Sequence, residues 1–309
     1  MTWTFERIHG PLGRPIGGLA WDGAAMLASD VQDNTILRFD PAGGAPTVFR
    51  RYTNRTSGLA FGPGGVLYGA QEGSRRVICF RTDGSTSVTQ TRFRGVLHNC
   101  PNALAVDSQG RVWFSDPYHP QSAMGPIPFP LLDHQSVLRL SCSPAPQSHW
   151  SIDRMTFDTR APRGIALSPD ERTLYVTENE LVPGGRRELR AYPVDAGVPA
   201  LDRHIVLYTA GADPRGVHRG IEGLCTDAAG NVVGCGGWAR SGPGSSVTVF
   251  SPEGQVQESH PLPVDVPTVC AFGGPGMRSL YVGTADGTLL CVRDTGRTGY
   301  QRHTPIRQA

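Results

Sequence analysis

Three polar side chains open three copies of one short repeated phrase. Asn102 opens NALAVDSQGRVWFSD, Arg163 opens RGIALSPDERTLYVTE, and Glu222 opens EGLCTDAAGNVVGCGG. A glutamate can accept or donate a proton, and an arginine can polarise a carbonyl group or stabilise an oxyanion. An asparagine adds an amide that can hold a ligand. If the fold brings these three residues together, they predict catalysis on a carbonyl compound.

The same phrase occurs three more times, at Gly17, Ser57 and Val269. Each copy contains two alternating apolar runs joined by a turn with Gly, Asp or Pro, which is typical of a β-hairpin. The copies start 40 to 61 residues apart. This spacing, with several short strands per unit, predicts an all-β, six-bladed β-propeller formed by residues 1–309 as one domain. The N-terminal run TWTFERI is expected to close the ring against the last blade.

In a propeller the innermost strand of each blade lines a central channel, so the residues that open the six phrases should meet at one mouth. Such a mouth is a natural pocket for a small-molecule substrate. Five residues are expected to contact the substrate there: Ser57 opens the second phrase, His98 precedes the third, and Tyr118, Glu178 and Trp238 stand in the variable insertions. The insertion that follows Asp116, residues 117–136, is Pro-rich and is expected to roof the pocket.

Composition limits the function classes. The net charge of +2 gives no reason to expect nucleic-acid or membrane binding. All 29 basic residues are arginine, which excludes a lysine base or a Schiff base. The start of the sequence does not resemble a signal peptide, and the seven cysteines form no CxxC pair. Reduced thiols in a cytoplasmic protein are therefore expected. Neither a histidine-pair zinc motif nor a GxSxG serine-hydrolase motif is present.

The chain resembles the senescence marker protein and gluconolactonase family over about residues 14–293. The phrases CPNALAVDSQGRVWFSDP, RGIALSPDERTLYVTEN, EGLCTDAAGNV and PTVCAFGGPGMRSLYV carry this resemblance. It implies a six-bladed propeller and a lactonase-like hydrolase that holds calcium or zinc at the channel mouth. Transferred residue by residue, the metal ligands would include Asn102 and Glu222, the latter in place of an aspartate.

Two positions depart from the family pattern, and both disfavour a cation. Gly17 stands where the family has a glutamate, and Arg163 stands where it has an asparagine. Three interpretations stay open at this point. The first is a hydrolase that binds metal through Glu222, Asn102 and other donors such as Glu178 or Asp116. The second is a metal-free enzyme in which Arg163 polarises a carbonyl group and Glu222 transfers protons, by hydrolysis or by ring rearrangement. The third is a non-catalytic ligand-binding propeller.

Overall fold

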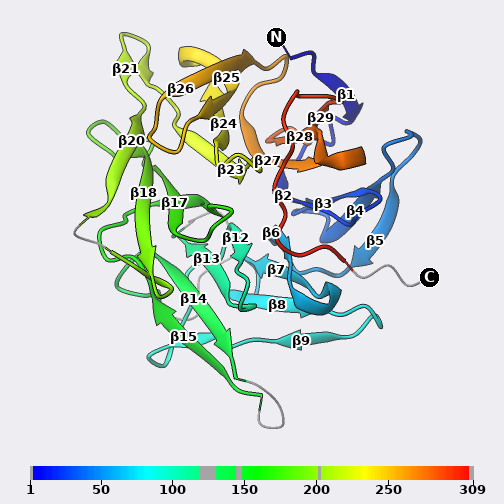
Figure 1. The fold of residues 1–309 in the computed structure, drawn as a ribbon, viewed down its shortest axis with the longest axis vertical. Coiled ribbons are helices and arrows are strands. Elements are labelled where there is room, and N and C mark those ends of the chain that lie inside the picture. Colours follow the sequence, from blue (N-terminus) through cyan, green and yellow to red (C-terminus); the bar gives the residue numbers. More distant parts are fainter. Residues whose placement is uncertain (1–2, 119–129, 144–147, 201–202, 306–309) are drawn as a thin grey trace.

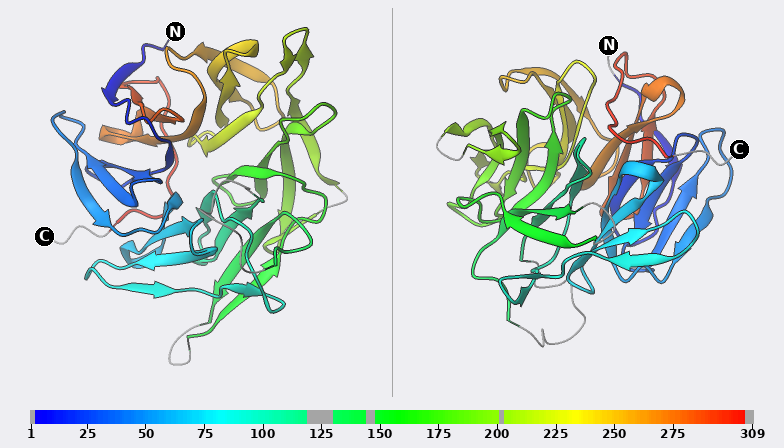
Figure 2. Two further views of the ribbon diagram at one scale, coloured as in Figure 1. Left: turned by 180° about the vertical axis from the view of Figure 1, so that it is seen from behind. Right: turned by 60° about the horizontal axis from the view of Figure 1, so that its bottom comes forward.

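The computed structural model describes residues 3–118, 130–143, 148–200 and 203–305. Six small antiparallel sheets stand around a common axis like the blades of a propeller, and colour follows the blades around the disc (Figure 1). The view from behind shows the same ring, and a tilted view shows the blades obliquely (Figure 2). The predicted fold class is confirmed. Within the described residues, no helix is long and apolar enough to cross a lipid bilayer.

Within each blade, the strands are given in order from the innermost to the outermost. Blade 1 contains β2 (Ile16–Trp21), β3 (Met26–Asp30), β4 (Thr35–Phe39) and β5 (Thr47–Arg51). Blade 2 contains β6 (Thr56–Phe61), β7 (Leu67–Gln71), β8 (Arg76–Phe80) and β9 (Thr86–Val88). Blade 3 contains β12 (Leu104–Val106), β13 (Val112–Asp116), β14 (Ser136–Cys142) and β15 (Trp150–Arg154). Blade 4 contains β16 (Pro162–Leu167), β17 (Thr173–Asn179), β18 (Arg187–Asp195) and β20 (Ile205–Thr209), with the short β19 (Val198–Pro199) also paired to β18. Blade 5 contains β23 (Ile221–Thr226), β24 (Val232–Trp238), β25 (Ser241–Phe250) and β26 (Val256–Pro261).

The sixth blade joins the two ends of the chain. It contains β27 (Pro267–Gly273), β28 (Ser279–Thr284) and β29 (Leu289–Val292), and its outer strand is β1 (Glu6–His9). β1 pairs antiparallel with β29, as the sequence predicted. The remaining elements are two small hairpins and two short 3-10 turns: β10 (Arg92–Phe93), β11 (Val96–Leu97), β21 (Ala212–Asp213), β22 (Gly216–Val217), η1 (Pro63–Gly65) and η3 (Pro275–Met277).

The small residue in each phrase lets neighbouring innermost strands come close together around the axis. A Cβ atom added at Gly58 would lie 2.3 Å from the carbonyl oxygen of Asn102, and one at Gly164 would lie 2.5 Å from that of Glu222. Real Cβ atoms do not approach backbone this closely, so only glycine fits at these positions. The glycines thus bring the first residues of adjacent phrases together at one end of the channel.

The opposite end of the channel is where the inner hairpins turn. There Asp107 accepts hydrogen bonds from the backbone amides of Gln109 (3.0 Å) and Arg111 (2.9 Å), and Asp170 accepts one from Arg172 (3.1 Å). Both aspartates therefore stabilise their turns.

A segment near the C-terminus crosses this hairpin end. We call residues 298–303 the strap. The backbone amide of Tyr300 donates to Thr226 O (3.0 Å), the side-chain amide of Gln301 donates to Trp21 O (3.0 Å), and His303 Nε2 lies 2.8 Å from Asp107 O. These contacts tie the strap to blades 5, 1 and 3. In Figure 1 the red trace runs past the centre of the disc toward the C-terminus.

The hydrophobic core lies between the blades rather than in one central mass. In one such layer, Val233 and Val249 of blade 5 pack with Leu280 and Val282 of blade 6, all of them fully buried. The seven cysteines are free thiols, and five of them are buried. The five buried thiols pack as small apolar side chains.

Candidate functional site at the channel mouth

The channel has a volume of about 220 Å³ and extends from the starts of the innermost strands to the strap. Its lining includes Gly17, Asn102, Glu222 and Val269 at one end and Arg302 at the other. Four of the six residues that open the phrases therefore line one end of the channel, and Ser57 and Arg163 lie beside them through their contacts with Asn102 and Glu222.

Glu222 is the central carboxylate of the mouth, and its side chain is 14% exposed. Its Oε2 accepts hydrogen bonds from Arg219 Nη2 (3.0 Å) and from Asn179 Nδ2. Its Oε1 has Arg163 Nε at 3.9 Å, which is an ion pair but too long for a hydrogen bond. The two oxygens therefore differ: Oε2 is held in place, and Oε1 makes no hydrogen bond to the described residues.

Arg163 is fixed by its backbone. Its carbonyl oxygen accepts a hydrogen bond from Ser115 Oγ (2.6 Å) in the neighbouring blade, and the next amide, Gly164 N, donates to Thr177 Oγ1 (2.7 Å). The guanidinium is 18% exposed and donates no hydrogen bond to any described residue. Apart from the ion pair with Glu222, its N–H groups are available to a ligand.

Asn102 and Ser57 complete the side of the mouth formed by blades 2 and 3. Asn102 Nδ2 lies 3.4 Å from Ser57 Oγ, a weak hydrogen bond that leaves the half-buried amide able to bind other groups, whereas Ser57 is buried. The backbone amide of Gly58 donates to Asn102 O (2.7 Å), which joins the two blades at this point.

Three charged or polar residues at the mouth were missed by the sequence analysis: Asn179, Arg219 and Glu72. Asn179 ends β17, Glu72 directly follows β7, and Arg219 lies three residues before Glu222. Burial raises the pKa of Glu72, while the nearby positive charges of Arg55 and Arg163 oppose that rise. The sequence contained a signal for Asn179 and Glu72. The second strand of each hairpin must end beside the start of the first strand, and both residues lie at such an end.

His98 does not reach the mouth, which corrects the expected substrate contact. Its ring is fully buried, with Nε2 3.0 Å from Gln90 O, and packs edge-on against Phe114 at a centroid distance of 5.2 Å. Burial lowers the pKa of His98 to about 4, so the ring is neutral near pH 7.

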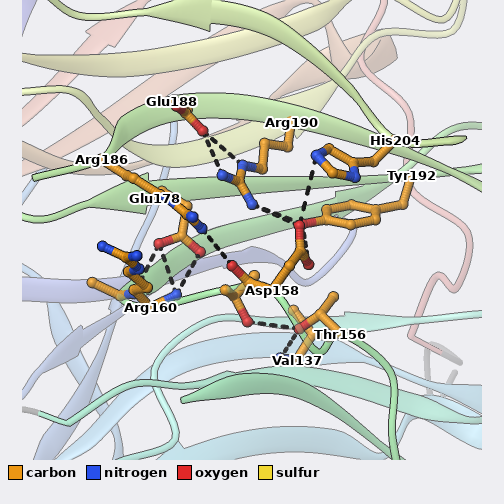
Figure 3. Close-up of polar contacts among 12 residues, drawn as sticks. Val137, Thr156, Asp158, Arg160, Glu178, Arg186, Glu188, Arg190, Tyr192 and His204 are labelled. Carbon is orange, nitrogen blue, oxygen red and sulfur yellow. Dashed lines mark hydrogen bonds and ion pairs between the residues drawn. The ribbon is translucent and has the colours of Figure 1, made fainter. Parts of the chain in front are cut away.

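Glu178 is also fully buried and cannot contact a substrate, which is a second correction. Its carboxylate accepts hydrogen bonds from the backbone amides of Arg160 (3.1 Å) and Ala161 (2.8 Å). Figure 3 shows this carboxylate beside a network in which Asp158 contacts Arg190 (2.8 Å). Glu178 therefore holds the segment that leads into Arg163.

Trp238 and Tyr118 lie outside this inner group. Trp238 is half-buried; its ring centroid lies 5.8 Å from the guanidinium of Arg219 and 5.3 Å from that of Arg240. Tyr118 is 38% exposed. Most of the insertion expected to roof the pocket, residues 119–129, lies outside the described residues, so substrate contact by Tyr118 and the roof stay predictions.

Asp116 ends β13 and is a fully buried carboxylate. Its Oδ2 accepts a hydrogen bond from Asn99 N (2.8 Å), and Oδ1 has no hydrogen-bond partner within the described residues. Burial raises its pKa from 3.8 to about 7. The folded protein therefore keeps a proton that the unfolded chain loses, and the free energy of unfolding should fall as pH rises from about 4 to about 7.

The variant Asp116→Asn should remove this pH dependence, because an amide can make the same acceptor contact without ionising. At pH 8 we expect the variant to be more stable than the natural protein, and at pH 4 no more stable. The scale is about 1.4 kcal/mol per unit of pKa shift. Thermal unfolding between pH 4 and 8 measures it, with Asp133→Asn as a control at a carboxylate that is 97% exposed. Stability curves of the Asp116 variant and the natural protein that run parallel over this range would contradict the prediction.

The residues at the mouth do not fit the divalent cation that the resemblance implies. Calcium needs six to eight oxygen ligands, several of them anionic. Here Oε2 of Glu222 already accepts two hydrogen bonds, and the fixed charge of Arg163 stands beside Oε1. A Cβ atom at Gly17 would lie 2.5 Å from Val31 Cγ2, so a side chain there needs its neighbours to move. The described part of the chain contains no group of three His, Cys, Asp or Glu able to hold a metal ion.

These observations define a class of protein: six-bladed propellers with a polar site at one mouth of the channel. The model of the SMP-30/gluconolactonase/LRE-like family matches residues 17–286, so the chain belongs to this family. This confirms the resemblance seen in the sequence.

Three known proteins illustrate the relationship. A gluconolactonase from Zymomonas mobilis is 24% identical over 257 residues, which cover 77% of this chain and 67% of that protein. A 6-deoxy-6-sulfogluconolactonase from Pseudomonas putida is 28% identical over 188 residues, covering 61% of this chain but little more than half, 55%, of that protein. A solved gluconolactonase structure from Xanthomonas campestris is 25% identical, with a TM-score of 0.73 over 93% of this chain and 89% of that one.

Proposed function

We propose that this protein is a lactonase-type hydrolase that opens a small lactone or related ester at the channel mouth without a divalent cation. The observation that carries the proposal is the pairing of Glu222, which has one oxygen free of hydrogen bonds, with Arg163, whose N–H groups are available. The family and the names of the relatives, a gluconolactonase and a 6-deoxy-6-sulfogluconolactonase, support a lactone as substrate.

In this proposal Arg163 receives the carbonyl oxygen of the lactone. Water adds to the carbonyl carbon while Oε1 of Glu222 accepts one of its protons. The negative charge that develops on the carbonyl oxygen is stabilised by the N–H groups of Arg163. As the ring C–O bond breaks, Glu222 returns the proton to the leaving alkoxide, and the product is an open-chain hydroxy acid.

Asn179 and Arg219 act as positioning residues. Both donate to Oε2, so they fix the carboxylate plane and leave Oε1 as the atom that exchanges protons. The amide of Asn102 is placed to bind hydroxyl groups or the ring oxygen of the substrate. Trp238 borders this arrangement through its contact with Arg219.

The proposal is tested with protein treated with a chelator and a panel of five- and six-membered lactones and simple esters. Acid release, followed with a pH indicator, should proceed at the same rate before and after chelation. If chelation abolishes activity and calcium, zinc or manganese restores it, the enzyme is metal-dependent and the metal-free mechanism is wrong. Failure to hydrolyse any member of the panel would count against a hydrolase and favour ring rearrangement or ligand binding alone.

A further inference from the structure

The described side chains at the mouth carry more positive than negative charge. Glu72 pairs with Arg55 at 3.4 Å, and Glu222 pairs with Arg219 at 3.0 Å. Arg163 is the third guanidinium. Its only ion pair to a described residue is the 3.9 Å contact with Glu222, whose carboxylate Arg219 already neutralises. Three guanidiniums therefore face two carboxylates.

Such an arrangement favours an anionic ligand. A charge that is largely removed from water requires a partner, and more than four-fifths of the Arg163 side chain is covered. The planar guanidinium matches the two oxygens of a carboxylate and binds them by paired, charge-assisted hydrogen bonds. The carbonyl group of a neutral lactone offers one oxygen and no charge, whereas the hydroxy acid formed from it offers two oxygens and one negative charge.

We propose that the channel mouth is a carboxylate-binding site centred on Arg163, and that it binds the open-chain hydroxy acid more tightly than the neutral lactone. The choice of hydroxy acid as ligand rests on the proposed function. Carboxylate binding itself depends only on the charges and contacts at the mouth. A product held in this way slows turnover as it accumulates, so a subsequent reaction that consumes the hydroxy acid must keep its concentration low.

The experiment is calorimetric titration with pairs of ligands that differ only in charge. Gluconate and gluconamide share one carbon chain and the same hydroxyl groups; 4-hydroxybutanoate and its amide form a smaller pair. We expect each acid to bind about ten- to a hundredfold more tightly than its amide, the range for hydrogen bonds to charged groups. In Arg163→Gln this preference should disappear, while the affinity for the amides stays nearly unchanged.

Arg302→Gln is the matched control, because Arg302 pairs with Glu171 at 2.9 Å near the far end of the same channel. This variant should keep the full preference for acids. Amides that bind as well as the acids, acids that do not bind at all, or a preference that survives in Arg163→Gln would each overturn the inference. Hydrolysis is measured separately. A carboxylate preference without lactone hydrolysis would support this site and contradict only the proposed function. Lactone hydrolysis without a carboxylate preference would support the proposed function and contradict only this site.

Discussion

Replacing Glu222 with glutamine should lower kcat for lactone hydrolysis by about two to four orders of magnitude, the usual contribution of a general base. Glutamine keeps the shape of the side chain, and its carbonyl oxygen can still accept from Asn179 or Arg219. It cannot take up a proton from water. Steady-state kinetics of the purified variant measure the effect, and its thermal unfolding should show that the fold is retained.

The chain supplies a matched control for this variant in Glu171. This glutamate lines the far end of the same channel, where it pairs with Arg302 at 2.9 Å. Glu171→Gln removes a carboxylate of similar burial that is also paired with an arginine, and it should leave kcat unchanged. Equal activity of the Glu222 variant and the natural protein would remove Glu222 from the mechanism.

Replacing Arg163 with methionine should lower kcat by about two to three orders of magnitude, as removal of an oxyanion donor does in other hydrolases. Methionine has a similar length and no N–H groups. The variant should be as stable as the natural protein or more stable, because a largely covered charge without a hydrogen-bonding partner is removed.

Two comparisons sharpen this prediction. Arg163→Lys keeps the charge but loses the planar pair of donors, so its kcat should lie between those of the natural protein and the methionine variant. Arg302→Met serves as the control at the far end of the channel. A change confined to KM in Arg163→Met would show that the arginine only binds the substrate and does not stabilise the transition state.

The blades could be predicted from the sequence because each phrase combines alternation with a glycine or another small residue at a fixed place. That pattern determines both the hairpin and its orientation toward the axis. It therefore predicted that Asn102, Arg163 and Glu222 lie at one mouth, and it predicted the closing strand that contains Glu6 and Arg7.

The positions of other site residues depend on features outside the phrase. Asn179 and Glu72 lie where second strands end, and the position of such an end depends on the length of each hairpin. His98 precedes Asn102 by only four residues, yet the chain turns between them and directs the ring into the blade instead of the channel. Arg219 lies three residues before the fifth phrase and was overlooked, although it donates to Oε2 of Glu222 at 3.0 Å.

The strap has a consequence for the order of events during turnover. Because it lines the far end of the channel and is bonded there to blades 5, 1 and 3, we expect ligands to enter and leave by the mouth rather than through the disc. A departing molecule must clear the mouth before the next one can occupy it, and water reaches the reacting groups by the same route. On this route exchange would alternate, and the time that one molecule stays bound would delay the arrival of the next.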